Sequence, residues 1–341
     1  MTLDSDTVLV LASKTDAHAD AIVYHLHDRG VPIVRLDVEE FWPPLGEITW
    51  RITDSEHVAR LKWKGREIDA DSVRSIYCRD FTFAKCDPAA DVETQLVYAE
   101  ARASLYGFLR NLEHRYWMNL PWYDQMAENK PYQMQCASNI GLAVPKTLVT
   151  NDCEAFKRFY EQCNGEVIIK QLSEICLIDD SELTNQEESN EADVKAYGFY
   201  TKRVRPEHFE KIEEIVSTPC LFQEHIPKKA DIRVTVVGDQ LFSAWIDSQS
   251  HQDSRIDFRQ KADLPIHHFR LPESVAGRLL DLIHSWHLEF AACDFVLTPK
   301  GELVFLEANV EGNWLWIEHE LELPISECIV DNLTKMVGRV G

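Results

Sequence analysis

Two short apolar segments flank a helical one at the start of the chain. TVLVLAS (7–13) and IVRLDVEEF (33–41) have the composition of strands, and AHADAIVYHLHDRG (17–30) between them has apolar residues at helical spacing and a terminal glycine. Strand, helix and strand within roughly 30 residues are typical of a parallel βαβ unit. Because parallel strands need such a crossover, the chain is expected to begin with an α/β domain.

The remaining strand and helix candidates divide the 341 residues into three parts. The N-terminal α/β domain, expected over 1–120, contains three more strand candidates and a long amphipathic helix: 48–53, 60–68, 72–81 and 91–114. A central part follows over 121–205. A β-rich C-terminal part over 206–341 carries two predicted hairpins, which turn at Gly238-Asp239 and Pro299-Lys300.

An acidic stretch interrupts the central part at residues 173–195, with no glycine and no basic residue before Lys195. Such a segment is either a solvated loop or a mobile lid over a site, since long loops are often functional. We assign it as an acidic lid of the central part.

The charge of the chain excludes some classes of function. With 35 Lys and Arg against 57 Asp and Glu, the net charge is −22, which argues against nucleic-acid binding because that affinity needs clustered basic residues. No apolar run approaches the roughly 20 residues that span a bilayer, and acidic residues stand where an export signal would be basic. Nine cysteines without a CxxC pair indicate reduced thiols. We therefore expect a cytoplasmic protein that does not bind membranes.

The segment LVFLEANVEGN (303–313) begins as an apolar strand and ends in acids. If Pro299-Lys300 is a two-residue turn, Phe305 lies opposite Asp294, and Phe305, Asp294, Glu307 and Asn309 share one face of the hairpin. Asp294 and Glu307 are then diagonal neighbours with Cα atoms roughly 7–8 Å apart. Two carboxylates and an amide oxygen at that distance suit Mg²⁺.

The same hairpin allows other readings. A three-residue turn would shift the register by one residue and put the two acids on opposite faces. A polar hairpin edge that faces water would also explain acids at a strand end. The apolar composition of both strands, ACDFV and LVFLE, favours the interior of a sheet.

Basic residues elsewhere follow apolar strands. Lys170 ends EVIIKQL, where a buried ammonium is unfavourable unless an anion pairs with it. Lys130 lies in ENKPYQM, and Arg233 lies at the start of a predicted hairpin. Each residue alone could equally be an ordinary surface or strand-edge residue. The sequence contains no Walker, GxGxxG, HExxH or GxSxG motif.

Taken in order, these segments resemble the ATP-grasp ligases, an α/β (α+β) fold that binds nucleotide between two α+β subdomains. The segments that carry the resemblance are NKP (129–131), IIKQL (168–172), QEHIPKKADIRVTVVGD (223–239), ACDF (292–295) and FLEANVEGN (305–313). SIYCRD, WMNLP and NWLWIE narrow it to the microviridin-type, or graspetide, peptide macrocyclases. The resemblance spans residues 70–340 and is weaker before them.

The resemblance implies a role for each matching residue. It implies that Lys130 and Lys170 contact the nucleotide phosphates and that Arg233 stabilises the transferred phosphoryl group, with Arg259 as a second catalytic residue. The adenine hinge and its neighbour would be Gln223, Glu224, His225, Ile226 and Asp231. Asp294, Glu307 and Asn309 would hold Mg²⁺.

Two features depart from the family pattern. The glycine-free acidic segment after Lys170 replaces a loop rich in glycine or small residues, and Arg79 lacks the second arginine expected after it.

Trp314 and Trp316 are expected to pack in the core. His284 and His287 share a helix face and are expected to be a surface pair, because no further zinc ligands stand nearby.

The function that the resemblance implies is an ATP-dependent carboxylate ligase. It would activate Asp or Glu side chains of a ribosomal precursor peptide, made of leader and core, as acyl phosphates and join them to Ser or Thr hydroxyls or Lys amines. ATP and Mg²⁺ would be required, and a homodimer fits the family. The alternatives are an ATP-grasp ligase that adds amino acids to a peptide or protein terminus, and an inactive peptide-binding homologue.

Overall fold

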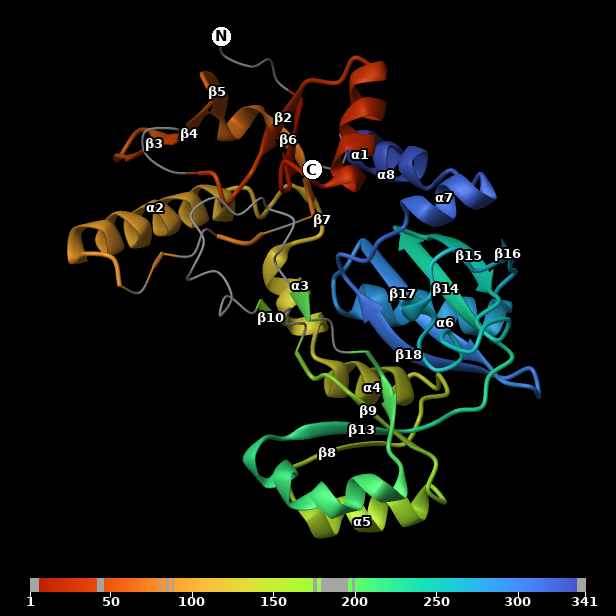
Figure 1. Ribbon diagram of the computed structural model, residues 1–341. Coiled ribbons are helices and arrows are strands. Elements are labelled where there is room, and N and C mark those ends of the chain that lie inside the picture. Colours follow the sequence, from red (N-terminus) through yellow and green to blue (C-terminus); the bar gives the residue numbers. More distant parts are fainter. Residues whose placement is uncertain are drawn as a thin grey trace, which may run out of the picture.

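The structure is a computed structural model of the chain and describes residues 6–41, 46–79, 81–83, 86–87, 89–173, 177–178, 196–197 and 200–335. The N-terminal sheet and the small sheet of β8, β9 and β13 lie at opposite ends of the molecule, with the large C-terminal sheet between them (Figure 1). In the described part of the chain, no helix combines the length and apolar composition needed to cross a membrane.

The N-terminal sheet confirms the predicted βαβ start. Its strand order is β2-β1-β6-β7, all pairs are parallel, and its strands are Thr7–Leu11 (β1), Ile33–Leu36 (β2), Val73–Cys78 (β6) and Tyr116–Met118 (β7). The crossover helix α1 (Ala17–Asp28) starts at Asp16, whose side chain accepts a hydrogen bond from the Ala19 amide at 2.9 Å. The helix α2 (Val92–Arg110) follows the 3₁₀ turn Ala70–Ser72 and β6.

A three-stranded antiparallel sheet is inserted after β2. It contains β3 (Gly46–Ile52), β4 (His57–Trp63) and β5 (Arg66–Asp69). A two-residue turn at Lys64-Gly65 divides the strand candidate 60–68 into β4 and β5, since Trp63 pairs with Arg66. Both turn residues have positive φ, 45° and 79°, as the twist of a tight hairpin requires.

A small sheet of order β12-β9-β13-β8 crosses the expected boundary between the central and C-terminal parts at residue 205. Its strands are Thr147–Thr150 (β8), Val167–Lys170 (β9), Lys202–Arg203 (β12) and Cys220–Glu224 (β13), with α5 (Cys153–Gln162) and a 3₁₀ segment Pro206–Ser217 beside it. Two-residue strands β10 (Leu177–Ile178) and β11 (Ala196–Tyr197) pair with each other. The predicted lid over 173–195 otherwise lies almost entirely outside the described residues.

The C-terminal sheet has the order β16-β15-β14-β17-β18 and contains both predicted hairpins. Its strands are Ala230–Val237 (β14), Gln240–Ile246 (β15), Ile266–His268 (β16), Phe290–Leu297 (β17) and Leu303–Asn309 (β18), and a 3₁₀ turn, Phe258–Gln260, precedes β16. The turn at Gly238-Asp239 is confirmed, because Val237 pairs with Gln240.

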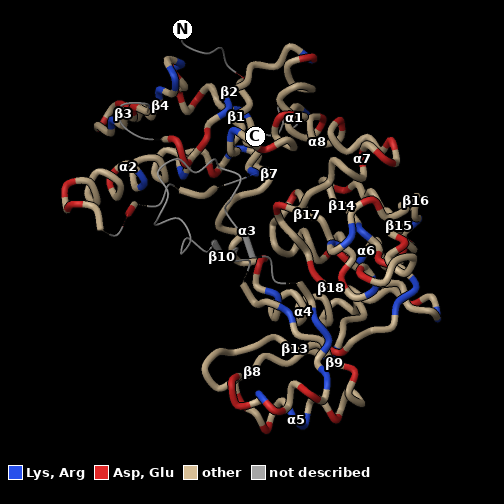
Figure 2. Tube along the Cα trace, in the orientation of Figure 1, with Lys and Arg blue, Asp and Glu red and all other residues tan. Residues whose placement is uncertain are grey.

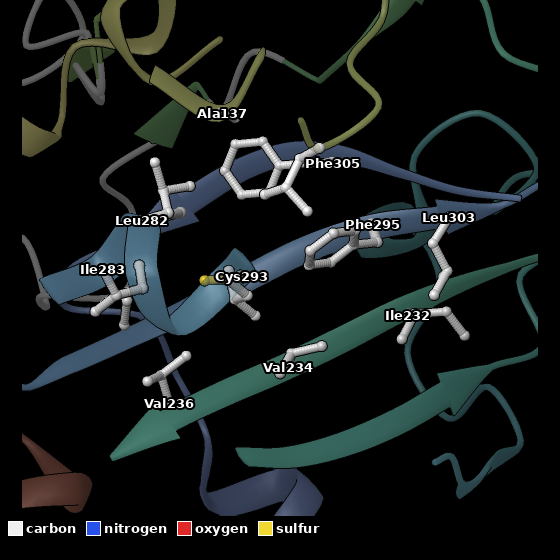
Figure 3. Packing of buried hydrophobic residues seen from close by; sticks show 14 of the residues in the cluster. Ala137, Ile232, Val234, Val236, Leu282, Ile283, Cys293, Phe295, Leu303 and Phe305 are labelled. Atoms are coloured by element: carbon white, nitrogen blue, oxygen red, sulfur yellow. The ribbon is translucent and has the colours of Figure 1, made fainter. Parts of the chain in front are cut away.

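Helices cover both faces of this sheet. One face forms the core shown in Figure 3, where Val234, Cys293, Phe295 and Phe305 pack under α6 (Glu273–Ser285) and α4 (Lys130–Asn139). The short helix α3 (Pro121–Ala127) leads into α4. The helices α7 (Leu315–Leu321) and α8 (Ile325–Lys335) connect the sheet to α1, with which α8 packs in a second core (Figure 1).

The predicted register of the β17–β18 hairpin is wrong at the turn. The Thr298 amide donates to the Glu302 carbonyl at 2.9 Å, so Glu302 rather than Gly301 lies opposite Thr298. The turn therefore has three residues and ends at Gly301, whose φ of 85° is the left-handed conformation that such turns need. Taken alone, this shift would separate the two acids.

A β-bulge at Leu306 restores the shared face. Phe295 pairs with Phe305, but Asp294 pairs with Glu307, so one residue of β17 faces two of β18. Phe305 turns into the core, where its ring meets that of Phe295 edge-on at 5.4 Å (Figure 3). The prediction that Phe305 shares the face of Asp294 is therefore wrong. Asp294 and Glu307 become directly opposed rather than diagonal neighbours.

Candidate functional site

A row of three charged side chains crosses the C-terminal sheet. Arg233 on β14 pairs with Asp294 on β17, which pairs with Glu307 on β18. Arg233 Nη1 lies 2.7 Å from Asp294 Oδ2, and the Asn309 amide donates to the same oxygen at 3.2 Å. Arg233 is 7% exposed and Glu307 is 9% exposed. The structure therefore brings together all three residues that the sequence predicts as metal ligands, with Arg233 beside them.

Two lysines reach this row from other elements. Lys130, the first residue of α4, places Nζ 3.7 Å from Glu307 Oε2. Lys170 is the last residue of β9, and its charge acts on Glu307. In Figure 2, basic segments (blue) of α4 and β9 lie near the acidic end (red) of β18. The predicted phosphate-binding lysines therefore face the predicted metal ligands across one site.

The buried charges shift one another's pKa values. Burial raises the pKa of Asp294; Arg233 opposes this shift and Glu307 adds to it. Burial would also raise the pKa of Glu307. The charges of the neighbouring cations outweigh burial and hold that pKa below its usual value; these cations are Lys170, Lys130, Arg259 and Arg233. Burial lowers the pKa of Lys170, and Glu307 opposes this shift. The site thus keeps at least Glu307 as a carboxylate.

The oxygen atoms of the row fit a hard cation. Asp294 Oδ2 is used by Arg233 and Asn309, whereas buried Oδ1 accepts no hydrogen bond within the described residues. A buried carboxylate oxygen without a partner is unfavourable unless a cation or water completes it. Two carboxylates and an amide match the few protein ligands that Mg²⁺ takes, the rest being water and phosphate.

Gln133, which the sequence analysis did not single out, fixes α4 against this row. Its side-chain amide donates to the Ala308 carbonyl at 2.8 Å and accepts from the Ala308 amide at 2.9 Å. Ala308 lies between Glu307 and Asn309, so this pair of bonds sets the distance of Lys130 from the acids. A glutamine within a helix carries no local signal of such a role.

The predicted hinge residues line a second, narrower pocket. Gln223, Glu224, His225, Ile226 and Asp231 all border it, with apolar walls from Ile168, Val296 and Leu306. Gln223 is 2% exposed, its amide nitrogen donates to Thr147 Oγ1 at 3.1 Å, and its buried Oε1 has no partner among the described residues. An acceptor held in this way fits the exocyclic amine of adenine.

Asp231, which the sequence analysis placed next to the adenine hinge, is buried within the protein. It forms a buried ion pair with Lys228, which the sequence analysis did not assign, at 2.6 Å. Lys228 also donates to the Ile256 carbonyl at 3.1 Å. Burial raises the pKa of Asp231 and Lys228 opposes the shift. The pair anchors the start of β14 beside the pocket.

Arg259 approaches the row from the 3₁₀ turn before β16. Its guanidinium forms two hydrogen bonds to Asp257, Nε to Oδ1 at 2.9 Å and Nη2 to Oδ2 at 2.7 Å. Asp257 also accepts from the Thr201 amide at 3.2 Å. Arg259 lines both pockets, so the structure places this predicted catalytic residue with the others.

The loop after β18 is held by two arginines. Arg79, 6% exposed, donates to the Glu311 carbonyl at 2.7 Å and to Asn313 Oδ1 at 3.4 Å, and Arg233 Nη2 donates to the Asn313 carbonyl at 3.2 Å. Arg79 therefore ties the N-terminal sheet to the loop next to Asn309, a link that only the long-range fold creates.

The two tryptophans of NWLWIE have different environments. Trp314 is fully buried, as predicted. Trp316 is 37% exposed and lines the larger cavity of about 560 Å³, so its predicted place in the core is wrong. α7 begins at Leu315, and its helical period turns the two side chains to different sides. Away from this site, the rings of His287 and Tyr123 lie 4.8 Å apart at a tilt of 37°, and His284 lies 3.6 Å from Asp239.

His18 gives the fold a pH dependence near this loop. Its ring meets Trp314 at 5.0 Å, and burial, then Arg79, lowers its pKa from 6.5 to about 4. Since the unfolded chain binds the proton between these values, the free energy of unfolding falls as pH falls from about 6.5 to about 4. Allowing for partial exposure, we expect His18 to contribute roughly 1–2 kcal/mol of this loss.

Urea unfolding at pH 7 and at pH 4.5 checks the expectation. The stability difference between wild type and His18→Asn should shrink or reverse at the lower pH. His27→Asn, on the exposed side of the same helix, is the control and should keep a constant difference. A constant difference for His18→Asn would contradict the assignment.

The comparisons with known proteins agree with this geometry. Residues 7–125 match the family model described as the MvdD pre-ATP grasp domain. The macrocyclase MdnB from Microcystis aeruginosa MRC is 29% identical, with 96% of this chain and 99% of that chain covered and a TM-score of 0.76. No curated protein sequence matches the chain significantly.

Two further structures are similar over nearly the whole length. Macrocyclase MdnC from Microcystis aeruginosa MRC, bound with precursor peptide MdnA, is 24% identical over 96% of this chain and 99% of that chain, with a TM-score of 0.79. A Chryseobacterium gregarium RiPP-associated ATP-grasp ligase, in complex with ADP and a leader and core peptide, is 23% identical over 97% of both chains, with a TM-score of 0.83. The predicted ATP-grasp fold and the similarity to microviridin-type macrocyclases are confirmed.

Proposed function

We propose that this chain, which has the ATP-grasp fold and resembles the microviridin-type macrocyclases, is an ATP-dependent ligase that cross-links side chains of a ribosomal precursor peptide. The observation that carries the proposal is the buried row Arg233–Asp294–Glu307, which faces Lys130 and Lys170 across one cavity. Two carboxylates beneath three cations are what a site for a metal-bound triphosphate needs.

The nucleotide would occupy both pockets. Adenine fits the hinge pocket, where Gln223 Oε1 can accept from its amine and Ile168, Val296 and Leu306 cover its faces. The phosphates then extend toward Lys170, Arg259 and Glu307, which border both pockets. Asp294, Glu307 and Asn309 are the residues that would hold Mg²⁺, which supplies charge neutralisation for phosphoryl transfer when bound.

The chain's own residues account for the chemistry of both steps. A carboxylate is a poor acyl donor, so the γ-phosphoryl group is transferred to an Asp or Glu side chain of the peptide. Arg233, held by Asp294 and Asn313, and Arg259, held by Asp257, are fixed in place and can stabilise the charge that develops during transfer. A hydroxyl or amine of the same peptide then attacks, and phosphate leaves. The reaction is intramolecular and therefore favoured by proximity.

The peptide partner follows from the relatives, two of which are described with precursor peptides. We propose that the substrate of this chain is a precursor peptide made of leader and core.

We also propose the division of the chain into an N-terminal domain over 1–120 and two ATP-grasp parts over 121–205 and 206–341. A homodimer is compatible with the resemblance, and light scattering would measure it. The cysteines of the described part are free, as a cytoplasmic protein would have them.

Mass spectrometry of a candidate precursor peptide, to be sought as a short reading frame beside the gene, tests the proposal. Incubation with enzyme, ATP and Mg²⁺ should remove one water per ring and form one ADP per ring. ADP release with single amino acids and no peptide would instead favour an amino-acid ligase. Failure to bind Mg-ATP, measured by calorimetry, would favour the inactive peptide-binding alternative.

A further inference from the structure

We propose that Asp257 is a positioning residue for phosphoryl transfer, which holds the guanidinium group of Arg259 and ties it, through the Thr201 amide, to the small sheet. The inference rests on the proposed ligase function and deepens it. It assigns to Asp257 the coupling of nucleotide binding between the two sheets to the orientation of a catalytic arginine.

Arg259 depends on Asp257 for its position. Its side chain is 54% exposed, and within the part of the chain that the structure describes its side-chain hydrogen bonds both go to Asp257, from Nε at 2.9 Å and from Nη2 at 2.7 Å. Its backbone amide also donates to Asp257 Oδ1 at 3.2 Å. Two parallel bonds to one carboxylate fix the plane of a guanidinium. An exposed arginine without such a partner would populate many rotamers.

The position of Arg259 matters because it acts on the charged row without bonding to it. Arg259 borders both pockets, and its charge acts on Asp294 and Glu307. Among the residues that the structure describes, neither carboxylate accepts a hydrogen bond from it. The outer edge of the guanidinium is thus directed by Asp257 alone, and preorganised donors of this kind stabilise a transferring phosphoryl group.

Asp257 shares one oxygen with the small sheet. Its Oδ2 accepts from the Thr201 amide at 3.2 Å, a buried bond between residues 56 positions apart in the sequence. Thr201 directly precedes β12, which pairs with β9, the strand that ends at Lys170. One carboxylate therefore receives both the guanidinium group of Arg259 and a backbone amide of the small sheet.

The segment that carries Asp257 is itself fixed to the C-terminal sheet. Lys228 donates to the Ile256 carbonyl at 3.1 Å and forms an ion pair at 2.6 Å with Asp231, the second residue of β14. The side chains of this ion pair are each 6% exposed. Asp257 therefore belongs with the C-terminal sheet, and its bond to Thr201 spans the two sheets.

The hinge pocket lies between the same two sheets. Its apolar and polar walls come from both of them: Ile168 and Gln223 from the small sheet, Val296 and Leu306 from the C-terminal sheet. A nucleotide bound there contacts both sheets, and Thr201 and Arg259 also line this pocket. Because coupling between two equilibria is reciprocal, a ligand that holds the sheets together also stabilises the bond from Thr201 to Asp257.

Replacing Asp257 with asparagine tests the positioning role. Asparagine keeps the size of the side chain but has no charge and one acceptor oxygen, so it cannot hold Arg259 and the Thr201 amide as aspartate does. At saturating Mg-ATP and peptide, the rate of acyl phosphate formation should fall about tenfold, whereas KM for ATP should change less than about threefold. Hydroxylamine measures this rate, since it attacks the acyl carbon, releases phosphate and leaves a hydroxamate.

Asp253→Asn is the matched control, because Asp253 lies in the same loop with its side chain 65% exposed. It should change neither the rate nor KM. A wild-type rate in Asp257→Asn, or a rise in KM without a fall in rate, would overturn the positioning role. Calorimetric titration with Mg-ADP gives the fraction of each variant that is folded and able to bind.

A double-mutant cycle with Arg259→Gln shows whether Asp257 acts through Arg259. If it does, D257N/R259Q should form acyl phosphate no more than about twofold more slowly than R259Q alone. Losses that multiply in the double variant would show that the two residues act independently and would overturn the inference.

Hydrogen exchange of wild type tests the link to the small sheet without any substitution. Mg-ADP should slow exchange of the Thr201 amide about tenfold, measured by mass spectrometry with electron-transfer fragmentation. The Ala19 amide, which donates to the Asp16 carboxylate far from the pockets, is the control and should not change. Unchanged exchange at Thr201 with Mg-ADP bound would overturn the coupling. Absence of hydroxamate and of ADP formation in wild type would instead overturn the ligase function, whatever the exchange at Thr201.

Discussion

Replacing Glu307 with glutamine is expected to lower peptide-dependent ADP formation by about 10²–10³-fold, because the site loses a metal-ligand oxygen and the charge that balances its cations. Glu307 lies directly opposite Asp294 and 3.7 Å from Lys130, so no other carboxylate of the row can take its place. Glutamine keeps the size of the side chain, which limits the change to charge and coordination.

The same substitution is expected to affect the binding of metal-free ADP differently from turnover. Lys170, Lys130, Arg233 and Arg259 all act on Glu307, and its neutralisation leaves their charge less compensated. Metal-free ADP should therefore bind at least as tightly as in wild type, whereas the gain in affinity on adding Mg²⁺ should disappear. Isothermal calorimetry with and without Mg²⁺ measures both.

Glu302→Gln is the matched control, because Glu302 is an exposed residue that directly follows the turn of the same hairpin. It should keep wild-type turnover and wild-type Mg²⁺ dependence. Unchanged turnover in Glu307→Gln would remove Glu307 from the site and leave the buried row without a metal-binding role.

Substitution of Gly312 by alanine is expected to lower turnover by about 100-fold and the free energy of unfolding by about 1–3 kcal/mol. An added Cβ would lie 2.3 Å from Ala292 Cβ, 3.0 Å from Arg233 Nη2 and 3.2 Å from Asn309 Cβ. The first contact is impossible without moving β17 away from the loop. Two of these neighbours belong to the proposed catalytic and metal-binding set, so the displacement reaches the reacting groups.

Gly277→Ala provides the control for a glycine substitution as such. Gly277 lies within α6, and an added Cβ there meets no atom within 4 Å. Alanine at this position should stabilise the helix by up to about 1 kcal/mol and leave turnover unchanged. Thermal unfolding and ADP release measure both variants. Wild-type turnover in Gly312→Ala would show that the loop after β18 tolerates displacement and does not position Arg233.

Much of the fold is readable from local patterns. The βαβ start follows from strand and helix periodicity at 7–41, and the tight turns at Lys64-Gly65 and Gly238-Asp239 follow from residues that accept positive φ. The acids of 303–313 were identified from a short segment, because acids at the end of an apolar strand are unusual, whereas the roles of the basic and hinge residues were implied by the resemblance to the ATP-grasp ligases. The sequence does not show directly that these residues meet at one place; their convergence was inferred from the resemblance.

The register of the β17–β18 hairpin shows what local patterns leave open. Relative to the register predicted from a two-residue turn, the three-residue turn shifts the strand pairing by one residue, and the bulge at Leu306 shifts it by one more. The two shifts together return Glu307 to the face of Asp294. The bulge has no local signal. It satisfies two long-range demands: Phe305 packs with Phe295 in the core and bonds through its amide to the Ala143 carbonyl at 2.8 Å, while Glu307 faces the cations.

The sequence by itself determined the classes of the elements, the tight turns and the identity of the charged residues, since these depend on neighbours along the chain. Only the tertiary structure decided that Arg79 holds the loop after β18, that Gln133 sets α4 against Ala308, and that Trp316 borders the cavity. These roles arise between residues more than 150 positions apart or from the direction in which a helix is packed. Burial makes such contacts selective, because a buried polar group is stable only where a distant segment supplies its partner.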